Sequence, residues 1–383
     1  MKTKHIIFTA AISALAVVSC KKEDPNADFQ PITQYQNSMP EFYKPVIDGE
    51  AYAQNAPDFK IIADSRDLVR LPNDLDFNTT PGKEFELWIL NEGTVNTGGT
   101  NVIISDAGED NQTDIYRKDG NSWHFMSIPT ALSFSAENGH FGTSSAIFDA
   151  NHNGGNPYAG PSLWDSDLSV FAQYAGPGTN GSHLDMLHES PYSMGITSEK
   201  DNKFWVFDGY SNEIVMYDFK EDHGPGMHDH SDGEVARYIE ATVTRRVGVP
   251  SHMILDKKTG WLYICDTGGK RIMRLDINSG NVKRNLPMLY EQLASRVEME
   301  NVQYEVFASS DLDAPCGIEI SGNRLLVSDN GTNEVIAYDL GTKQELGRLQ
   351  TPATNLRGIK VGPKGKLWYV DYSGNQVVRI DPK

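Results

Sequence analysis

The sequence predicts an all-β protein folded as a six-bladed β-propeller. Four segments of the sequence share one pattern. A strand with alternating apolar residues is followed by a polar turn, then by a strand that ends in Asp, and then by a third strand. The segments are residues 190–219, 249–277, 314–340 and 355–381. Two weaker copies precede them at residues 71–117 and 128–173. Repeated units stack because none can bury its apolar face alone, and small antiparallel sheets stack into a ring.

Residues 1–19 read as a lipoprotein signal peptide. Lys2 and Lys4 precede an apolar run at residues 6–18, which is too short to span a bilayer as a permanent helix. The residues up to Cys20 resemble a lipobox, which implies that Cys20 is lipidated and becomes the amino terminus. The alternative is an ordinary secretory signal that is cut elsewhere.

Residues 20–57 form the lipidated Cys and a polar tether rich in Pro, Asn and Gln. The charged run directly after Cys20 resembles surface-export signals of some Gram-negative lipoproteins. We therefore expect a cell-envelope protein, lipid-anchored to the outer membrane and facing the exterior. Its only contact with the membrane would be this lipid.

Residues 59–68 are the expected partner of the last repeat, because the chain ends soon after that repeat's third strand. Their strand would complete the final blade and remove the open sheet edges that invite aggregation. The propeller then covers residues 58–383. The alternative is an open β-sandwich with turns at a similar spacing.

The repeat consists of an inner strand, a strand that ends in Asp and a strand with the pattern N-x-V-x-x-Y/L-D. This repeat resembles that of the NHL-repeat propellers. The resemblance implies a six-bladed ring. It implies no single activity, because that family includes enzymes, sensors and scaffolds.

The net charge is −18, and removal of residues 1–19 leaves 32 basic against 52 acidic side chains. Such an acidic chain is repelled by nucleic acid and by anionic membranes. The one basic cluster is Thr244-Arg245-Arg246. We expect a monomer.

Cys265 and Cys316 fall on adjacent blades. They could form a disulfide or remain as two buried free thiols, and the free thiols are the preferred interpretation.

Histidines concentrate at the third and fourth repeats. Outside the signal there are nine, and six of these lie between residues 183 and 252. Imidazoles with nearby carboxylates suit Zn, Cu or Fe, so the sequence raises the hypothesis of a metal at the channel mouth. The candidate ligands are His188, His230 and His252, with His183 and His228 as further candidates. The alternative is that the 222–233 loop binds nothing.

Pro250-Ser251-His252 resembles the motif by which the peptidyl-hydroxyglycine amidating lyase, a six-bladed propeller, holds zinc through histidines. The resemblance implies a metal-dependent lyase. Ser193 and Gly317 occupy the equivalent positions in two other repeats, so the family's three-histidine set is not reproduced.

Two further residues fall at the starts of inner strands, where a propeller exposes its channel. Arg357 is a candidate to hold a carboxylate or phosphate, and Tyr192 to donate a proton or to stack on a sugar. The Asp that ends each second strand recurs in every clear repeat, which favours a structural role in capping the next turn. Residues 283–310 show apolar residues near helical spacing, which predicts a short amphipathic helix.

No nucleophile elbow, phosphate-binding loop or H-E-x-x-H motif occurs. The sequence therefore favours a lipid-anchored propeller that binds a small molecule, a glycan or a protein on its channel face. The alternative is a metal-dependent lyase or hydrolase with its metal between the third and fourth blades.

Overall fold

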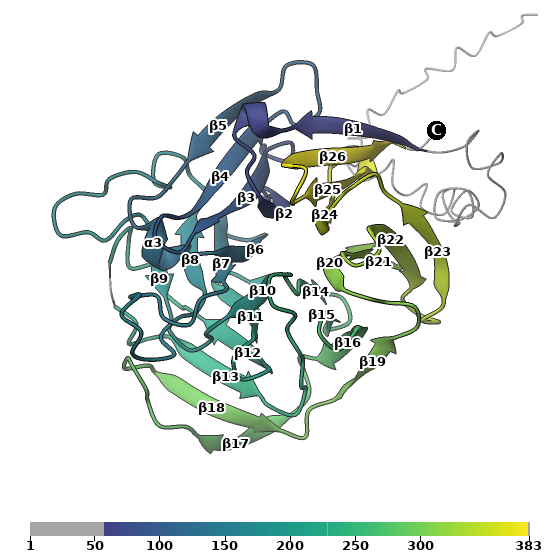
Figure 1. Cartoon of the computed structure of the whole chain (residues 1–383). Coiled ribbons are helices and arrows are strands. Elements are labelled where there is room, and N and C mark those ends of the chain that lie inside the picture. The colour runs from purple at the N-terminus through teal and green to yellow at the C-terminus, as the bar shows by residue number, and fades with distance from the viewer. Residues whose placement is uncertain (1–56, 228, 382–383) are drawn as a thin grey trace, which may run out of the picture.

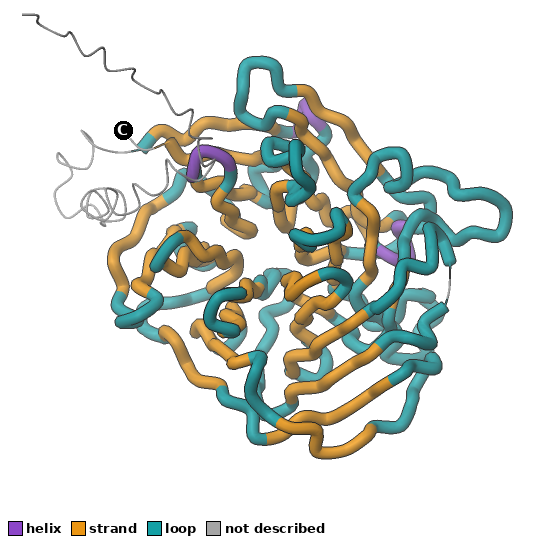
Figure 2. Tube along the Cα trace, turned by 180° about the vertical axis from the view of Figure 1, so that it is seen from behind, coloured by secondary structure: helices purple, strands orange, loops and turns teal. Residues whose placement is uncertain are grey.

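The computed structural model describes residues 57–227 and 229–381, and these form six small sheets arranged in a ring (Figure 1). Strands account for almost all of the regular structure (Figure 2). Cys20 and the segments predicted as signal peptide and tether lie outside the described residues, apart from residue 57. No helix among the described residues is long and apolar enough to cross a membrane.

In blades 1 to 5 the four strands of the blade run outward from the channel in chain order. Blade 1 contains β2 (Pro72–Phe77), β3 (Leu87–Thr94), β4 (Gly98–Ser105) and β5 (Thr113–Arg117), and blade 2 contains β6 (Pro129–Phe134), β7 (His140–Ser145), β8 (Ser162–Asp165) and β9 (Asp185–Met186). Blade 3 contains β10 (Ser193–Lys200), β11 (Lys203–Asp208), β12 (Glu213–Asp218) and β13 (Glu234–Tyr238), and blade 4 contains β14 (Met253–Asp256), β15 (Trp261–Asp266), β16 (Arg271–Asp276) and β19 (Tyr304–Ala308). Blade 5 contains β20 (Pro315–Ser321), β21 (Arg324–Asp329), β22 (Glu334–Asp339) and β23 (Glu345–Gln350).

Blade 6 confirms the predicted closure of the ring. Its own strands are β24 (Leu356–Val361), β25 (Leu367–Asp371) and β26 (Gln376–Asp381). Its outermost strand is β1 (Asp58–Ala63), which pairs antiparallel with β26, as Figure 1 shows. The first and last described strands therefore share one sheet.

The prediction of a helix within residues 283–310 is wrong. That stretch forms the strands β17 (Asn281–Asn285) and β18 (Ser295–Glu300), and β18 pairs in parallel with β13 at the outer edge of blade 3. Apolar spacing along the chain does not reveal this partner, because β strands depend on neighbours that are distant in sequence. The described helices are short: α3 (Ser122–Phe125) and two 3-10 turns, η1 (Ser65–Asp67) and η2 (Pro363–Gly365).

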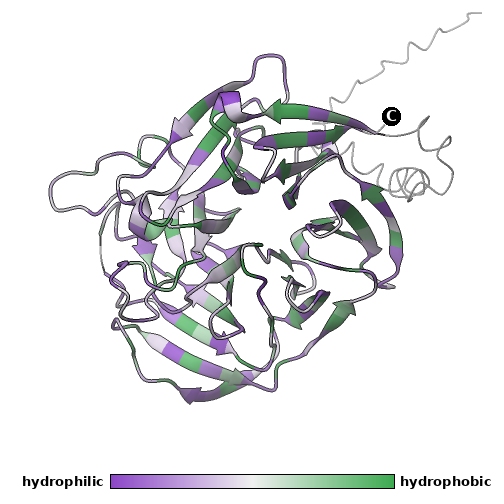
Figure 3. Ribbon diagram, in the orientation of Figure 1, coloured by the Kyte–Doolittle hydropathy of each residue, from purple (hydrophilic) through white to green (hydrophobic). Residues whose placement is uncertain are grey.

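Hydrophobic residues lie mainly on the strands, and hydrophilic residues colour many of the connecting loops (Figure 3). In the described chain the buried apolar residues form six clusters, each shared by two neighbouring blades. Trp88, Trp164, Trp205 and Trp368 are among the largest fully buried side chains. Each blade thus buries its faces against its neighbours, as repeated units must. Cys265 and Cys316 are buried free thiols, the preferred of the two interpretations.

The recurring Asp at the end of each second strand has the predicted structural role. The Asp329 carboxylate accepts hydrogen bonds from the backbone of Gly331 in its own turn, and of Asp313 and Ala314 in the connection from blade 4. Asp371 repeats the arrangement at blade 6 with Gly374, Thr354 and Asn355. In blades 5 and 6 the carboxylate therefore ties the turn to the segment that enters the blade.

Candidate functional site

Because neighbouring strands within a blade are antiparallel, the start of every first strand and the turn between the second and third strands lie on one face. We call this the mouth face; it carries the connections between blades and the starts of the inner strands. The sequence placed Tyr192, His252 and Arg357 at these starts, and the structure confirms that position for all three.

The channel is a narrow polar pocket to which all six inner strands contribute. Its polar lining includes Asp74, Ser133, Thr197, His252 and Lys360. The Lys360 Nζ lies 3.2 Å from Asp76 and 3.1 Å from Glu319, so opposite charges are paired inside the channel. Burial raises the pKa of Asp74 to about 8, which makes this carboxyl mostly neutral at pH 7.

His252 lies in this channel with the Nε2 atom 2.9 Å from the carbonyl oxygen of Thr130, to which it donates in the neutral ring. Its Nδ1 atom lies 3.5 Å from Asp74. Burial lowers the pKa of His252 to about 4, so the ring is neutral at pH 7. The nitrogen that donates to Thr130 is not available to a metal ion. His252 contacts Thr130 and Asp74, whereas His188 contacts Glu291 and His230 contacts Asp185, so the three histidines have no described partner in common through these contacts.

Arg357 spans the channel mouth, and each of its three side-chain nitrogens donates a hydrogen bond to the protein. Its Nη2 donates to the carbonyl oxygen of Gly248 at 2.8 Å, its Nη1 to Asn73, and its Nε to Asn355 at 3.1 Å. The guanidinium also lies over the Tyr372 ring, 3.3 Å from its centroid. These contacts join blades 1 and 6 to the connection between blades 3 and 4, so they favour a structural role over the predicted capture of an anion.

Tyr192 belongs to a group that the sequence did not reveal. Its ring packs near Phe148, at 5.9 Å between centroids, and under the guanidinium of Arg245, at 4.0 Å. Phe148 in turn contacts Tyr210 edge-on at 5.3 Å. We call Phe148, Tyr192, Tyr210 and Arg245 the aromatic–arginine group; Phe148 and Tyr210 come from turns within blades 2 and 3, Tyr192 and Arg245 from connections between blades, and all four lie on the mouth face.

The backbone of Tyr192 is in the left-handed region, with φ of 54°. Its amide donates to Ile147 at 2.7 Å and its carbonyl accepts from Gly209 at 3.1 Å, so both neighbouring segments hold it in place. Left-handed backbone is costly for a residue with a Cβ. Tyr192 is half-buried, whereas Tyr210 is 53% exposed.

The structure brings together two of the predicted metal ligands, His188 and His230, between blades 2 and 3. The centroids of their rings lie 6.1 Å apart. Glu291 accepts from the Nδ1 of His188 at 3.0 Å, and Asp185 from the Nδ1 of His230 at 2.5 Å. The sequence did not indicate Glu291, because it belongs to the β17–β18 hairpin.

The Nε2 of His188 is buried and has no hydrogen-bond partner among the described residues. Burial alone would lower the pKa of His230, but the hydrogen bond to Asp185 and the charges of Asp185 and Glu291 outweigh it and raise that pKa. Burial would raise the pKa of Glu291, but the hydrogen bond and charge of His188 lower it overall.

Neither His183 nor His252 joins this pair. His183 stacks on Phe125, with 3.5 Å between ring centroids, and its Nδ1 contacts the carbonyl oxygen of Asn180. His228 lies outside the described residues. Within residues 57–227 and 229–381, no three or more His, Cys, Asp or Glu side chains are arranged to hold a metal ion.

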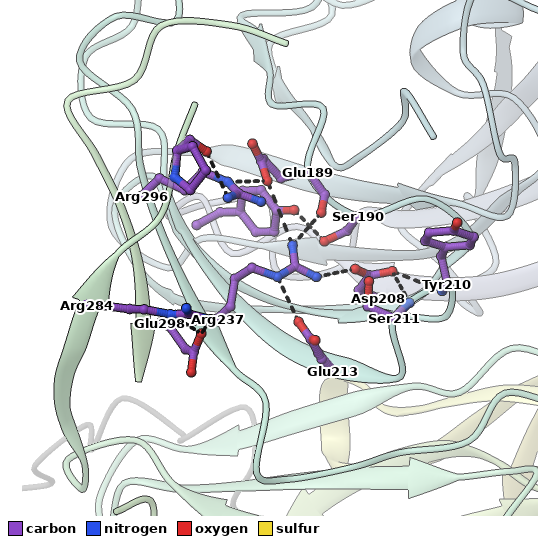
Figure 4. A network of polar contacts seen from close by, with 12 residues as sticks. Glu189, Ser190, Asp208, Tyr210, Ser211, Glu213, Arg237, Arg284, Arg296 and Glu298 are labelled. Carbon is purple, nitrogen blue, oxygen red and sulfur yellow. Dashed lines mark hydrogen bonds and ion pairs between the residues drawn. The ribbon is translucent and has the colours of Figure 1, made fainter. Parts of the chain in front are cut away.

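A buried ion-pair network lies behind the mouth face in blade 3 (Figure 4). Arg237 donates to Glu213 at 2.7 Å, to the carbonyl oxygen of Glu189 at 2.7 Å and to Asp208. The carboxylate of Glu189 accepts from Arg296 of β18 at 2.8 Å. The network joins β13, β18 and the connection between blades 2 and 3, so it fixes the position of the turn that carries Tyr210.

No family model matches the sequence, and no curated protein matches it. Solved structures with the same fold include auxiliary nutrient binding proteins of Bacteroides ovatus and Bacteroides thetaiotaomicron. Both match with a TM-score of 0.52 over 81% of this chain, at 13% and 10% identity, and the matches cover 69% and 68% of those chains. A chain of a nidogen–laminin complex matches at 16% identity over 76% of this chain and 84% of its own, but its TM-score of 0.43 is too low to add to the comparison. These likenesses show the fold alone, and the resemblance to NHL repeats stays a prediction.

Proposed function

We propose that this protein is a lipid-anchored, extracytoplasmic propeller that binds a ligand on its mouth face through the aromatic–arginine group. The observation that carries the proposal is the exposed ring of Tyr210, which packs against Phe148 beside the strained backbone of Tyr192. Aromatic rings held rigidly at a surface supply contact area at a low entropic cost. A rigid scaffold that presents such side chains on loops is the usual arrangement of a binding site.

Two observations support binding over catalysis. Inside the channel, the charges of Lys360, Asp76 and Glu319 are paired with one another. At the mouth, the donors of Arg357 are occupied by Asn73, Asn355 and Gly248. In addition, two proteins that share the fold are named as nutrient binding proteins, which supports a ligand-binding role for a propeller of this kind.

The test is to titrate the full-length protein with a panel of neutral and acidic oligosaccharides and to measure binding by calorimetry. Tyr210→Ala should weaken binding by roughly tenfold or more, because a stacked aromatic ring contributes on the order of 1–2 kcal/mol. Tyr174→Ala is the matched control, because Tyr174 is 80% exposed on a loop of the opposite face. Equal losses in both variants would reject the proposal.

The proposed anchor rests on the lipobox-like sequence that ends at Cys20. Cys20→Ala should remove the lipid and release the protein from the membrane fraction into the soluble fraction. Immunoblots of the two fractions measure this. A variant that stays with the membrane would show that another segment anchors the chain.

A metal-dependent lyase or hydrolase remains the second candidate on one observation. His188 and His230 each have their Nδ1 atom held by a carboxylate, which is the usual outer contact of a metal-binding imidazole. Elemental analysis of the purified protein and of His188→Ala separates the two functions. Stoichiometric metal that is lost in the variant would favour the enzyme, and metal-free wild-type protein would remove its support.

A further inference from the structure

Arg245 is a half-buried cation that makes no ion pair with a described carboxylate. Its guanidinium carbon lies over the Tyr192 ring, 4.0 Å from the ring centroid, which is a cation–π contact on the mouth face. Stacking engages the face of the guanidinium and leaves the N–H groups at its edge. An arginine held in this way is pre-arranged to bind an acceptor with two oxygens.

The surroundings of Arg245 are positively charged, although the whole chain carries a net charge of −18. Lys270 lies 2.6 Å and Arg246 3.6 Å from the same carboxylate, that of Asp313. Arg271 lies 2.6 Å from Asp266. Three cationic side chains therefore share two carboxylates, and Arg245, next to Arg246 in the chain, pairs with neither of them.

Backbone contacts hold these residues together at one blade junction. Asp266 accepts from the amide of Thr244 at 2.7 Å, and the amide of Gly268 donates to the carbonyl oxygen of Thr244 at 2.7 Å. The turn that carries Lys270 and Arg271 is thereby fixed against the segment that carries Arg245 and Arg246. The positive patch is thus part of the folded mouth face and borders Tyr192.

We infer that the ligand of the mouth face is a carbohydrate that carries carboxylate groups, and that Arg245 binds one of them. This inference rests on the proposed function. A carboxylate matches the paired N–H groups of a guanidinium, and the C–H face of a sugar ring packs against an aromatic ring such as Tyr210. An acidic peptide fits less well, because peptides dock on strand edges or in helix grooves, and this face consists of turns and connections.

The test uses the full-length protein and two forms of one probe, oligogalacturonides and the same oligomers with every carboxylate methyl-esterified. The acid form should bind roughly tenfold or more tightly than the ester, because a hydrogen bond between charged groups contributes about 1.5–3 kcal/mol. Arg245→Gln should abolish this preference, and Arg245→Lys should keep part of it. Arg284→Gln is the control, because it removes one exposed positive charge from the outer edge of blade 3.

The outcomes separate the two proposals. Equal affinity for the acid and the ester, with binding still lost in Tyr210→Ala, would overturn the inference and leave the proposed function in place. The inference also fails if Arg245→Gln binds the acid form as the wild type does. Binding of poly-glutamate that depends on Arg245, with no binding of either oligogalacturonide, would replace the carbohydrate with an acidic peptide.

Discussion

Phe59 of β1 lies directly opposite Ile380 of β26, so the two ends of the described chain pair within blade 6. Ile380 is completely buried, and Phe59 packs against the same apolar cluster between blades 5 and 6. The ring is therefore closed by strand pairing together with burial of apolar side chains. This closure positions the first and last inner strands around the same channel.

Ile380→Ala should lower the free energy of unfolding by about 2–5 kcal/mol, because it leaves a cavity at this junction. Denaturant unfolding followed by tryptophan fluorescence measures the change. Val282→Ala is the control at an outer strand, where Val282 is 57% exposed and the expected change is within about 0.5 kcal/mol. Similar losses in the two variants would show that burial at the closing blade is not what stabilises the ring.

The repeat predicted the architecture because its signals are local. Strand alternation and the Asp that caps each turn, such as Asp329, recur within each unit and depend on few distant contacts. The candidate site was harder to predict. Glu291 reaches His188 across 103 positions of the chain, and Phe148, Tyr210 and Arg245 come from blade 2, blade 3 and the connection between blades 3 and 4. The packing of neighbouring blades and the pairing of β18 with β13 bring such residues together.

Arg237→Ala should destabilise the fold by about 3–5 kcal/mol, because it leaves the fully buried carboxylate of Asp208 without its cation. Thermal and denaturant unfolding of the variant provide the measurement. Arg66→Ala is the control, because the Arg66 side chain is 86% exposed and surface ion pairs contribute about 0–1 kcal/mol. An Arg237→Ala protein as stable as Arg66→Ala would mean that the network of Figure 4 does not stabilise blade 3.

His230 should make stability depend on pH. Its folded pKa is raised, chiefly by Asp185 against the opposing effect of burial, with further contributions from Glu291 and Asp229. A group with a raised folded pKa contributes its full stabilisation below the unfolded pKa of about 6.5 and loses it as the pH rises through the folded pKa. The gap between the melting temperatures of wild type and His230→Gln should therefore be larger at pH 6 than at pH 9.

Asp185→Asn provides the control for this pH dependence. In the Asp185→Asn protein, His230 has lost its hydrogen-bonded carboxylate. The melting-temperature difference between Asp185→Asn and Asp185→Asn with His230→Gln should therefore change much less between pH 6 and pH 9. If the gap in the wild-type background is the same at pH 6 and pH 9, the charge of His230 does not stabilise the junction of blades 2 and 3.

Tyr192 should tolerate glycine better than alanine. Both substitutions remove the ring that contacts Arg245. The difference in stability between the two variants therefore reports the cost of the backbone conformation at this position, where φ is 54°. A Cβ in the left-handed region costs roughly 1–2 kcal/mol, which outweighs the entropy of about 0.5–1 kcal/mol that glycine loses on folding. The free energy of unfolding of Tyr192→Gly should therefore be about 0.5–1 kcal/mol larger than that of Tyr192→Ala, which makes the glycine variant the more stable of the two. Tyr158, which is not left-handed, is the matched control, and there alanine should be the more stable variant. If alanine is the more stable variant at both positions, the backbone of Tyr192 carries no strain.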